Sequence, residues 1–118
     1  MRSTREAGNY GEELARQYLE KRGLTYMASN WLCKYGEVDL VMQDGSTRVF
    51  IEVKLRSRTS YAEGLEMVTT QKQEKIIRAV KHYQQEKDYW GDVRFDVVAI
   101  SMDGDKPSIE HVEYAFEA

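Results

Sequence analysis

The segment from residue 36 to residue 56 constrains the fold more than any other part of the chain. It reads GEVDLVMQDGSTRVFIEVKLR, which is two strand-like runs on either side of Gly45 and Ser46. A two-residue loop that begins with glycine is typical of a type II′ β-turn, which joins its flanking strands as an antiparallel hairpin. Asp44 then faces Thr47, and the two residue numbers of every further pair sum to 91. The segment therefore predicts two neighbouring strands in a fixed register.

This register assigns the apolar side chains of the hairpin to one face of a sheet. The face receives three apolar pairs: Val38 with Val53, Leu40 with Ile51, and Met42 with Val49. A shift of one residue would move all of these side chains to the other face, so the uniform set supports the register.

The opposite face of the hairpin brings like charges together. Asp39 faces Glu52, and Glu37 faces Lys54. Facing Cβ atoms lie about 5 Å apart, where two carboxylates destabilise a sheet unless something neutralises them. One acid can be protonated, a nearby cation can pair with both, or a divalent metal ion can bind between them. An ordinary salt-bridge cluster of these four residues explains the pattern equally well.

Helical segments are predicted before and after the hairpin. Ser3 and Glu6 fit a capping box and Gly23 fits a helix stop, which indicates a helix at residues 4–22. Thr70 and Gln73 fit a second capping box. The remaining expectations are strands at 24–32, 94–102 and 108–116, a long loop at 57–69 and a second helix at 70–87, in the order αβββαββ.

The first predicted helix has an unusually small packing face. Gly8, Ala15 and Leu19 form the stripe, and Gly11 lies to one side of it. Glycine costs about 1 kcal/mol in a helix relative to alanine, so we expect this helix to lie very close to the surface that it covers. Glu12 projects about 40° from the centre of the stripe and can reach the sheet.

Length, composition and cysteine content exclude several classes of protein. The 118 residues suffice for one domain, expected to span residues 1–118. No apolar run approaches the roughly 18 residues of a membrane span, and residues 1–10 lack the apolar core of a signal peptide, so a cytoplasmic location is expected. Cys33 is the only cysteine, and His82 and His111 lie far apart, which excludes a zinc site of Cys and His ligands.

Positive charge is concentrated in the middle of the chain. The net charge is -3, but residues 48–81 contain eight Lys or Arg and four Asp or Glu, whereas the other residues contain nine and sixteen. Such a basic segment fits either a solvated face or a surface that contacts phosphates. Asp96 lies among apolar residues and is predicted to be the buried partner of an arginine, with a fourth acid of a functional site as the alternative.

The charged residues of the hairpin and of the first helix suit metal-assisted phosphodiester cleavage. Carboxylates of Glu12, Asp39 and Glu52 offer the oxygen ligands that Mg²⁺ prefers. Lys54 lies one step along the same strand face from Glu52 and can orient a water or stabilise developing charge.

Four motifs carry a resemblance to a known family. They are GxxGExxAxxYL at residues 8–19, GEVDLV at 36–41, FIEVKLR at 50–56 and RFDVV at 94–98. The chain resembles the YraN-type uncharacterised bacterial family of the PD-(D/E)XK nuclease superfamily, related to Holliday junction resolvases. The resemblance implies a restriction-endonuclease-like α/β fold, in which two helices flank a mixed β-sheet. It also implies Mg²⁺ or Mn²⁺ as cofactor and a nucleic-acid substrate, with branched DNA as one option.

The family motif transfers residue by residue onto this chain. Glu12, Asp39, Glu52 and Lys54 match the catalytic positions, and the first three would hold the metal. Candidates for contacts with nucleic acid follow the third strand or begin the second helix: Arg56, Arg58, Gln71 and Lys72. The loop around Tyr61 and Gly64 is expected to order on substrate. Two cuts in a symmetric junction would call for a homodimer. A non-catalytic nucleic-acid-binding module that keeps the fold is the alternative function.

Overall fold

The described part of the chain forms two helices and one five-stranded sheet. A computed structural model describes residues 4–56 and 68–118. The elements in chain order are α1 (Thr4–Lys21), β1 (Thr25–Cys33), β2 (Gly36–Asp44), β3 (Thr47–Arg56), α2 (Thr70–Lys87), β4 (Asp92–Asp103) and β5 (Lys106–Phe116). This is the predicted order αβββαββ. The predicted loop at 57–69 lies, except for its last two residues, outside the described residues.

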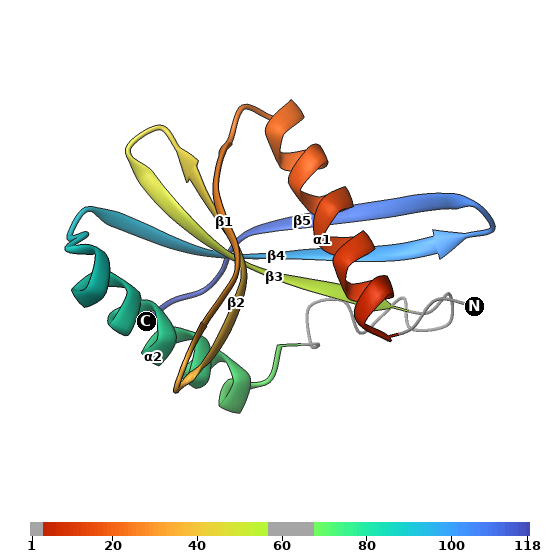
Figure 1. Cartoon of the computed structure of the whole chain (residues 1–118). Coiled ribbons are helices and arrows are strands. Elements are labelled where there is room, and N and C mark those ends of the chain that lie inside the picture. Colours follow the sequence, from red (N-terminus) through yellow and green to blue (C-terminus); the bar gives the residue numbers. More distant parts are fainter. Residues whose placement is uncertain (1–3, 57–67) are drawn as a thin grey trace.

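The sheet is mixed and has one helix on each face. Its strands follow the chain order β1-β2-β3-β4-β5, and only β3 and β4 pair in parallel. Helix α1 packs on one face and α2 on the other (Figure 1). Long parallel pairing of β3 with β4 requires the crossover that α2 provides. The predicted fold class, a restriction-endonuclease-like α/β fold, is confirmed. Neither helix in the described part of the chain is long and apolar enough to cross a membrane.

Helix α1 lies close to the sheet, as its small residues predicted. Ala15 and Leu19 are fully buried. A Cβ atom on Gly11 would lie 2.8 Å from Cδ2 of Leu55 on β3, so only glycine fits there without displacing Leu55. Gly23 ends the helix with a φ of 97°, a conformation that favours glycine.

The hairpin of β2 and β3 has the predicted turn and the predicted register next to it. Gly45, but not Ser46, has a positive φ, as a type II′ turn requires. Five pairs follow the expected sum, from Asp44 with Thr47 to Leu40 with Ile51. The turn chemistry was therefore sufficient to place these ten residues.

Beyond Leu40 the predicted register fails. The backbone ladder between β2 and β3 ends there, and Oδ2 of Asp39 instead accepts the N–H of Val53 at 2.8 Å. In the expected register that N–H would bond to the carbonyl of Val38. Val38 packs in the cluster under α2, whereas Leu40 and Met42 pack under α1, so the prediction that all three share a face is wrong. The side chain of Asp39 has replaced a backbone partner.

Helix α2 has the predicted bounds, but its N-cap lies one residue before the Thr70 that the capping box predicted. The cap is Thr69, whose Oγ1 accepts the N–H of Lys72 at 3.1 Å. Gln73 donates its side-chain amide to the carbonyl of Val68 at 3.0 Å. The helix buries Val80 and Tyr83 against the sheet. Its first turn therefore starts directly beside Val68, which is itself buried.

Candidate functional site

Three carboxylates meet where the ladder between β2 and β3 ends. Glu12 on α1 and Glu37 and Asp39 on β2 each offer an oxygen, and these three atoms lie within 4.8 Å of one another. Glu12 directly follows Gly11, so the close approach of α1 brings this carboxylate to the sheet. We call Glu12, Glu37 and Asp39 the acid cluster.

Asn30 connects two members of the acid cluster. Its Nδ2 donates to Oε1 of Glu12 at 2.8 Å and to Oε1 of Glu37 at 2.9 Å. Asn30 has a φ of 51°, a left-handed conformation that asparagine adopts more readily than most residues. It lies between the paired residues Ser29 and Trp31 of β1, next to the point where β2 loses its regular alternation. Asparagine is rare in strands, and its presence in the predicted first strand was the one signal in the sequence that could have identified Asn30 as a site residue.

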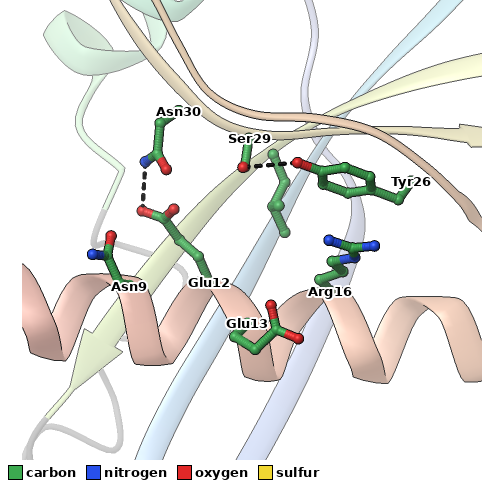
Figure 2. Close-up of a pocket in the computed structure, with 8 residues that line it drawn as sticks. Asn9, Glu12, Glu13, Arg16, Tyr26, Ser29 and Asn30 are labelled. Carbon is green, nitrogen blue, oxygen red and sulfur yellow. Dashed lines mark hydrogen bonds between the residues drawn. The ribbon is translucent and has the colours of Figure 1, made fainter.

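A pocket opens beside the acid cluster, between α1 and β1. It encloses about 320 Å³. Figure 2 shows the carboxylate of Glu12 rising from α1 to meet Asn30, while Tyr26 and Ser29 close the other end through a hydrogen bond of 2.9 Å. The guanidinium of Arg16 lies 3.6 Å from the centre of the Tyr26 ring. The pocket gives solvent access to Glu12.

The acid cluster is electrostatically strained. Burial and then the charge of Glu52 raise the pKa of Asp39 to about 8, although the N–H of Val53 lowers it. Burial also raises the pKa of Glu12, against the hydrogen bond from Asn30, and the charges of Glu37 and Glu52 add to the rise. Both carboxyl groups would be relieved by a cation.

Glu52 lies next to Asp39 but has two lysine partners. Its Oε1 lies 2.6 Å from Nζ of Lys72 and 3.4 Å from Nζ of Lys54. Lys72 comes from the first turn of α2, so this helix brings a second ammonium to β3. Burial lowers the pKa of Lys54, and Lys72 lowers it further, against the effect of Glu52. At a given pH the amine of Lys54 is therefore neutral in a larger fraction of molecules than that of an exposed lysine.

The structure brings the four predicted catalytic residues into one neighbourhood, with two differences from the expected arrangement. Asp39 and Glu52 interact electrostatically but are not a ladder pair. Glu37 bonds to Asn30 rather than to Lys54, and it joins Glu12 and Asp39 in the closest set of carboxylates. The sequence prediction missed Glu37 as a site residue because it relied on the hairpin register beyond the point where the register ends.

The predicted nucleic-acid contacts differ in their accessibility. The side chain of Arg56 is 6% exposed and pairs with Glu110 on β5 at 3.1 Å. Lys72 is engaged with Glu52. Gln71 is exposed at the start of α2, whereas Arg58, Tyr61 and Gly64 lie outside the described residues. Gln71 is thus the predicted contact that faces solvent most directly.

Asp96 is the buried partner of an arginine, as predicted. Arg94 donates to both of its carboxylate oxygens, at 2.9 and 3.0 Å. Oδ2 also bonds to Nε2 of His111 at 2.7 Å, and Oδ1 accepts the N–H of Tyr114 at 3.1 Å. We call Arg94, Asp96, His111 and Tyr114 the Asp96 cluster. The role of His111 was not foreseen, because the bulge that brings Tyr114 to Asp96 leaves no mark in the sequence pattern.

The mixed sheet, its two flanking helices and a site built from a helix glutamate, a strand aspartate and Glu-x-Lys define an α/β protein of restriction-endonuclease-like fold. The chain belongs to the Uncharacterised protein family UPF0102, whose profile matches residues 11–100. This is the YraN-type family, so the predicted relationship is confirmed.

The relatives are similar over nearly their full length. A UPF0102 protein of Legionella pneumophila (strain Corby) is 42% identical over 120 residues, which cover 98% of each chain. One from Stutzerimonas stutzeri (strain A1501) is 40% identical over 120 residues and covers 100% of both chains. One from Rhodococcus opacus (strain B4) is 44% identical over 111 residues, 92% of this chain and 94% of its own.

Proposed function

We propose that the protein is a metal-dependent endonuclease that acts on DNA, with branched DNA as the preferred substrate. The observation that carries the proposal is the convergence of three carboxylates within 4.8 Å beside Glu52 and Lys54. Carboxylates held close to one another, with Glu12 and Asp39 partly buried, cost free energy unless a cation or a proton compensates them. A ligand that needs these carboxylates would explain why the fold holds them together.

The donor set fits a hard divalent cation. Glu12, Asp39 and Glu52 would hold Mg²⁺ or Mn²⁺, and Glu37 offers a further oxygen donor. A bound divalent ion lowers the pKa of a water ligand and polarises a phosphate oxygen. Burial and the neighbouring acids raise the pKa of Asp39 and of Glu12, and a bound cation would lower both.

The lysines of the site have separate roles in the proposed reaction. Lys54, whose side chain is 20% exposed, can accept a proton from the attacking water or donate to the phosphate. Lys72 is more exposed and draws the phosphate backbone toward the site. Glu52 holds both ammonium groups in place.

A cleavage screen tests the proposal. Labelled single-stranded, duplex, flap and four-way DNA are incubated with Mn²⁺, and we expect cutting of the flap or four-way substrate. Lys54→Ala and Asp39→Asn should lower the rate at least about 100-fold. Glu13→Gln is the matched control, because Glu13 lies on the same helix, is exposed and bonds only to Gln17 among the described residues. Cleavage that survives Asp39→Asn would exclude the proposed site.

A non-catalytic DNA-binding module is a second candidate, favoured by one contact. Nζ of Lys72 lies 2.6 Å from Glu52, so a lysine neutralises an acid that a metal would use. Salt-dependent DNA binding without cleavage of any substrate, together with no heat of Mn²⁺ binding in calorimetry, would establish this alternative.

A further inference from the structure

A second pocket lies between α2 and the turn that joins β1 to β2. It encloses about 380 Å³ and is lined by Tyr35, Arg78, Lys81, His82 and Gln85. The four helix residues follow a spacing of three, four and seven, which places them on one face of α2. Residues of α2 that face the sheet, such as Val80 and Tyr83, are not part of this lining. The pocket is therefore built from a helix face that the core leaves free.

Aromatic rings form one wall of this pocket. The ring centroid of His82 lies 6.0 Å from that of Tyr35 and 5.9 Å from that of Trp31. Tyr35 is 39% exposed, so its ring is available to a ligand. His82 is held between the two other rings. The rings of Tyr35 and His82 are inclined at 66°, so the exposed ring of Tyr35 is the surface on which a base can stack, and His82 lies beside it.

Uncompensated positive charge forms the other wall. Arg78 and Lys81 are exposed, and neither forms an ion pair with any residue that the structure describes. Lys75 is exposed one turn earlier on α2, and Nζ of Lys34 lies 5.1 Å from the Tyr35 ring. The basic segment of the sequence thus has a definite place in the fold, although the chain as a whole is acidic.

We infer that this pocket binds an unpaired nucleotide of the DNA substrate. The base stacks on Tyr35 beside His82, and the flanking phosphates bind Arg78 and Lys81. A volume above roughly 300 Å³ suits a ligand of nucleotide size. Bases in a continuous duplex have no free face, so the ring wall selects single-stranded segments such as flaps and open junction ends.

The position of the pocket relative to the acid cluster supports one continuous strand across both. Tyr35 precedes Glu37 by two residues, which separates their Cα atoms by at most about 7 Å. Gly36 between them lies close to α2, since a Cβ atom there would be 3.9 Å from Cβ of Lys75. The backbone of β2 thus connects the pocket with Glu37 of the acid cluster, and in this inference the strand seated in the pocket continues toward the cluster. The inference rests on the proposed function and specifies its substrate.

Binding measured without metal tests the inference separately from cleavage. Fluorescence anisotropy with labelled single-stranded, flap and blunt duplex DNA is recorded in a chelator. Tyr35→Ala should raise Kd about tenfold for single-stranded and flap DNA and leave duplex unchanged, while Tyr35→Phe keeps the ring and should bind as the wild type does. Equal effects on all three DNAs, or none, would overturn the inference.

A charge pair and its matched control complete the test. Arg78→Gln with Lys81→Gln should weaken binding about tenfold and flatten the salt dependence. Lys21→Gln with Arg22→Gln removes the same charge from exposed positions at the end of α1 and should change Kd less than about twofold. Equal losses in both pairs, or a wild type that binds none of the DNAs, would refute the pocket. Binding through the pocket without cleavage would refute the proposed endonuclease activity and leave the inference about the pocket intact.

Discussion

The acid cluster and the Asp96 cluster use the same type of residue in opposite ways. Burial alone would raise the pKa of Asp96, but its hydrogen bonds with His111 and Arg94 outweigh burial and hold the pKa below its ordinary value. Burial is also the largest cause that raises the pKa of Asp39, to about 8; the charge of Glu52 adds to it, and a single backbone donor, the N–H of Val53, opposes it. Burial therefore raises the pKa of both carboxyl groups, and the partners of each group decide whether that rise remains.

The two clusters also differ in how the chain assembles them. Arg94 and Asp96 are two residues apart on β4 and share a face of the sheet, so one strand supplies the main ion pair. The acid cluster takes its members from α1 and β2 and its neighbours from β3 and α2. A site assembled from four elements can respond to a ligand, whereas a pair on one strand secures the fold.

Removing the charge of Asp96 should have the largest effect on stability. Asp96→Asn leaves Arg94 buried with only Asp44 as an anionic partner among the described residues, and we expect a loss of about 3–5 kcal/mol in the free energy of unfolding. Urea denaturation measures this. Asp44→Asn is the control, because Asp44 binds the same guanidinium but its side chain is 45% exposed, and it should cost less than about 1 kcal/mol. Similar losses in both variants would show that the two carboxylates do not differ in importance.

Divalent cations should stabilise the protein through the acid cluster. At a concentration a hundredfold above Kd, Mn²⁺ should add about 2.7 kcal/mol to the free energy of unfolding. Thermal melts with and without Mn²⁺ measure the gain. In the same melts, Mn²⁺ should stabilise Asp39→Asn only slightly and should stabilise Glu13→Gln as much as the wild type. An undiminished gain in Asp39→Asn would place the bound ion elsewhere.

The smallest expected change in stability is that of Asp39→Asn, and it is a gain, whereas Asp96→Asn should cause a loss. In the metal-free protein Asp39→Asn should increase the free energy of unfolding at pH 9, because the folded pKa of Asp39, about 8, lies above that of an unfolded aspartate. We expect a net gain of only about 1–2 kcal/mol, because asparagine accepts the N–H of Val53 less strongly than a carboxylate does. The advantage should decline as pH falls through about 8 and be absent below about pH 4, where the carboxyl group is protonated in both states. Urea denaturation of the variant and the wild type in a chelator, at pH 9 and below about pH 4, measures this difference in stability. A variant less stable than the wild type at pH 9 would contradict the strain in the acid cluster.

The sequence was sufficient for the elements and for most of the candidate site. Gly45 and Ser46 determined the turn, and the turn determined five pairs of the β2–β3 ladder. The angular position of Glu12 on α1 was enough to bring it to the sheet. These features depend on local geometry, which the sequence pattern reports directly.

The remaining features depend on side chains that take over backbone positions. The carboxylate of Asp39 captures the N–H of Val53 and ends the ladder, and no alternation of apolar residues indicates this. Asn30 adopts a left-handed conformation inside β1 and thereby joins Glu12 to Glu37. Lys72 reaches Glu52 only because α2 begins beside β3. Each of these contacts is made across elements, so the pattern of one segment does not reveal it.

Gly11 has no functional group, yet it sets the spacing on which the acid cluster depends. A methyl carbon on Gly11 would stand 2.8 Å from Cδ2 of Leu55 on β3, so a larger residue would have to displace this side chain or the helix. Glu12 is the next residue, so its carboxylate inherits that spacing. A side chain at position 11 would push against Leu55, and any resulting outward shift of α1 would carry the carboxylate of Glu12 away from Glu37 and Asp39.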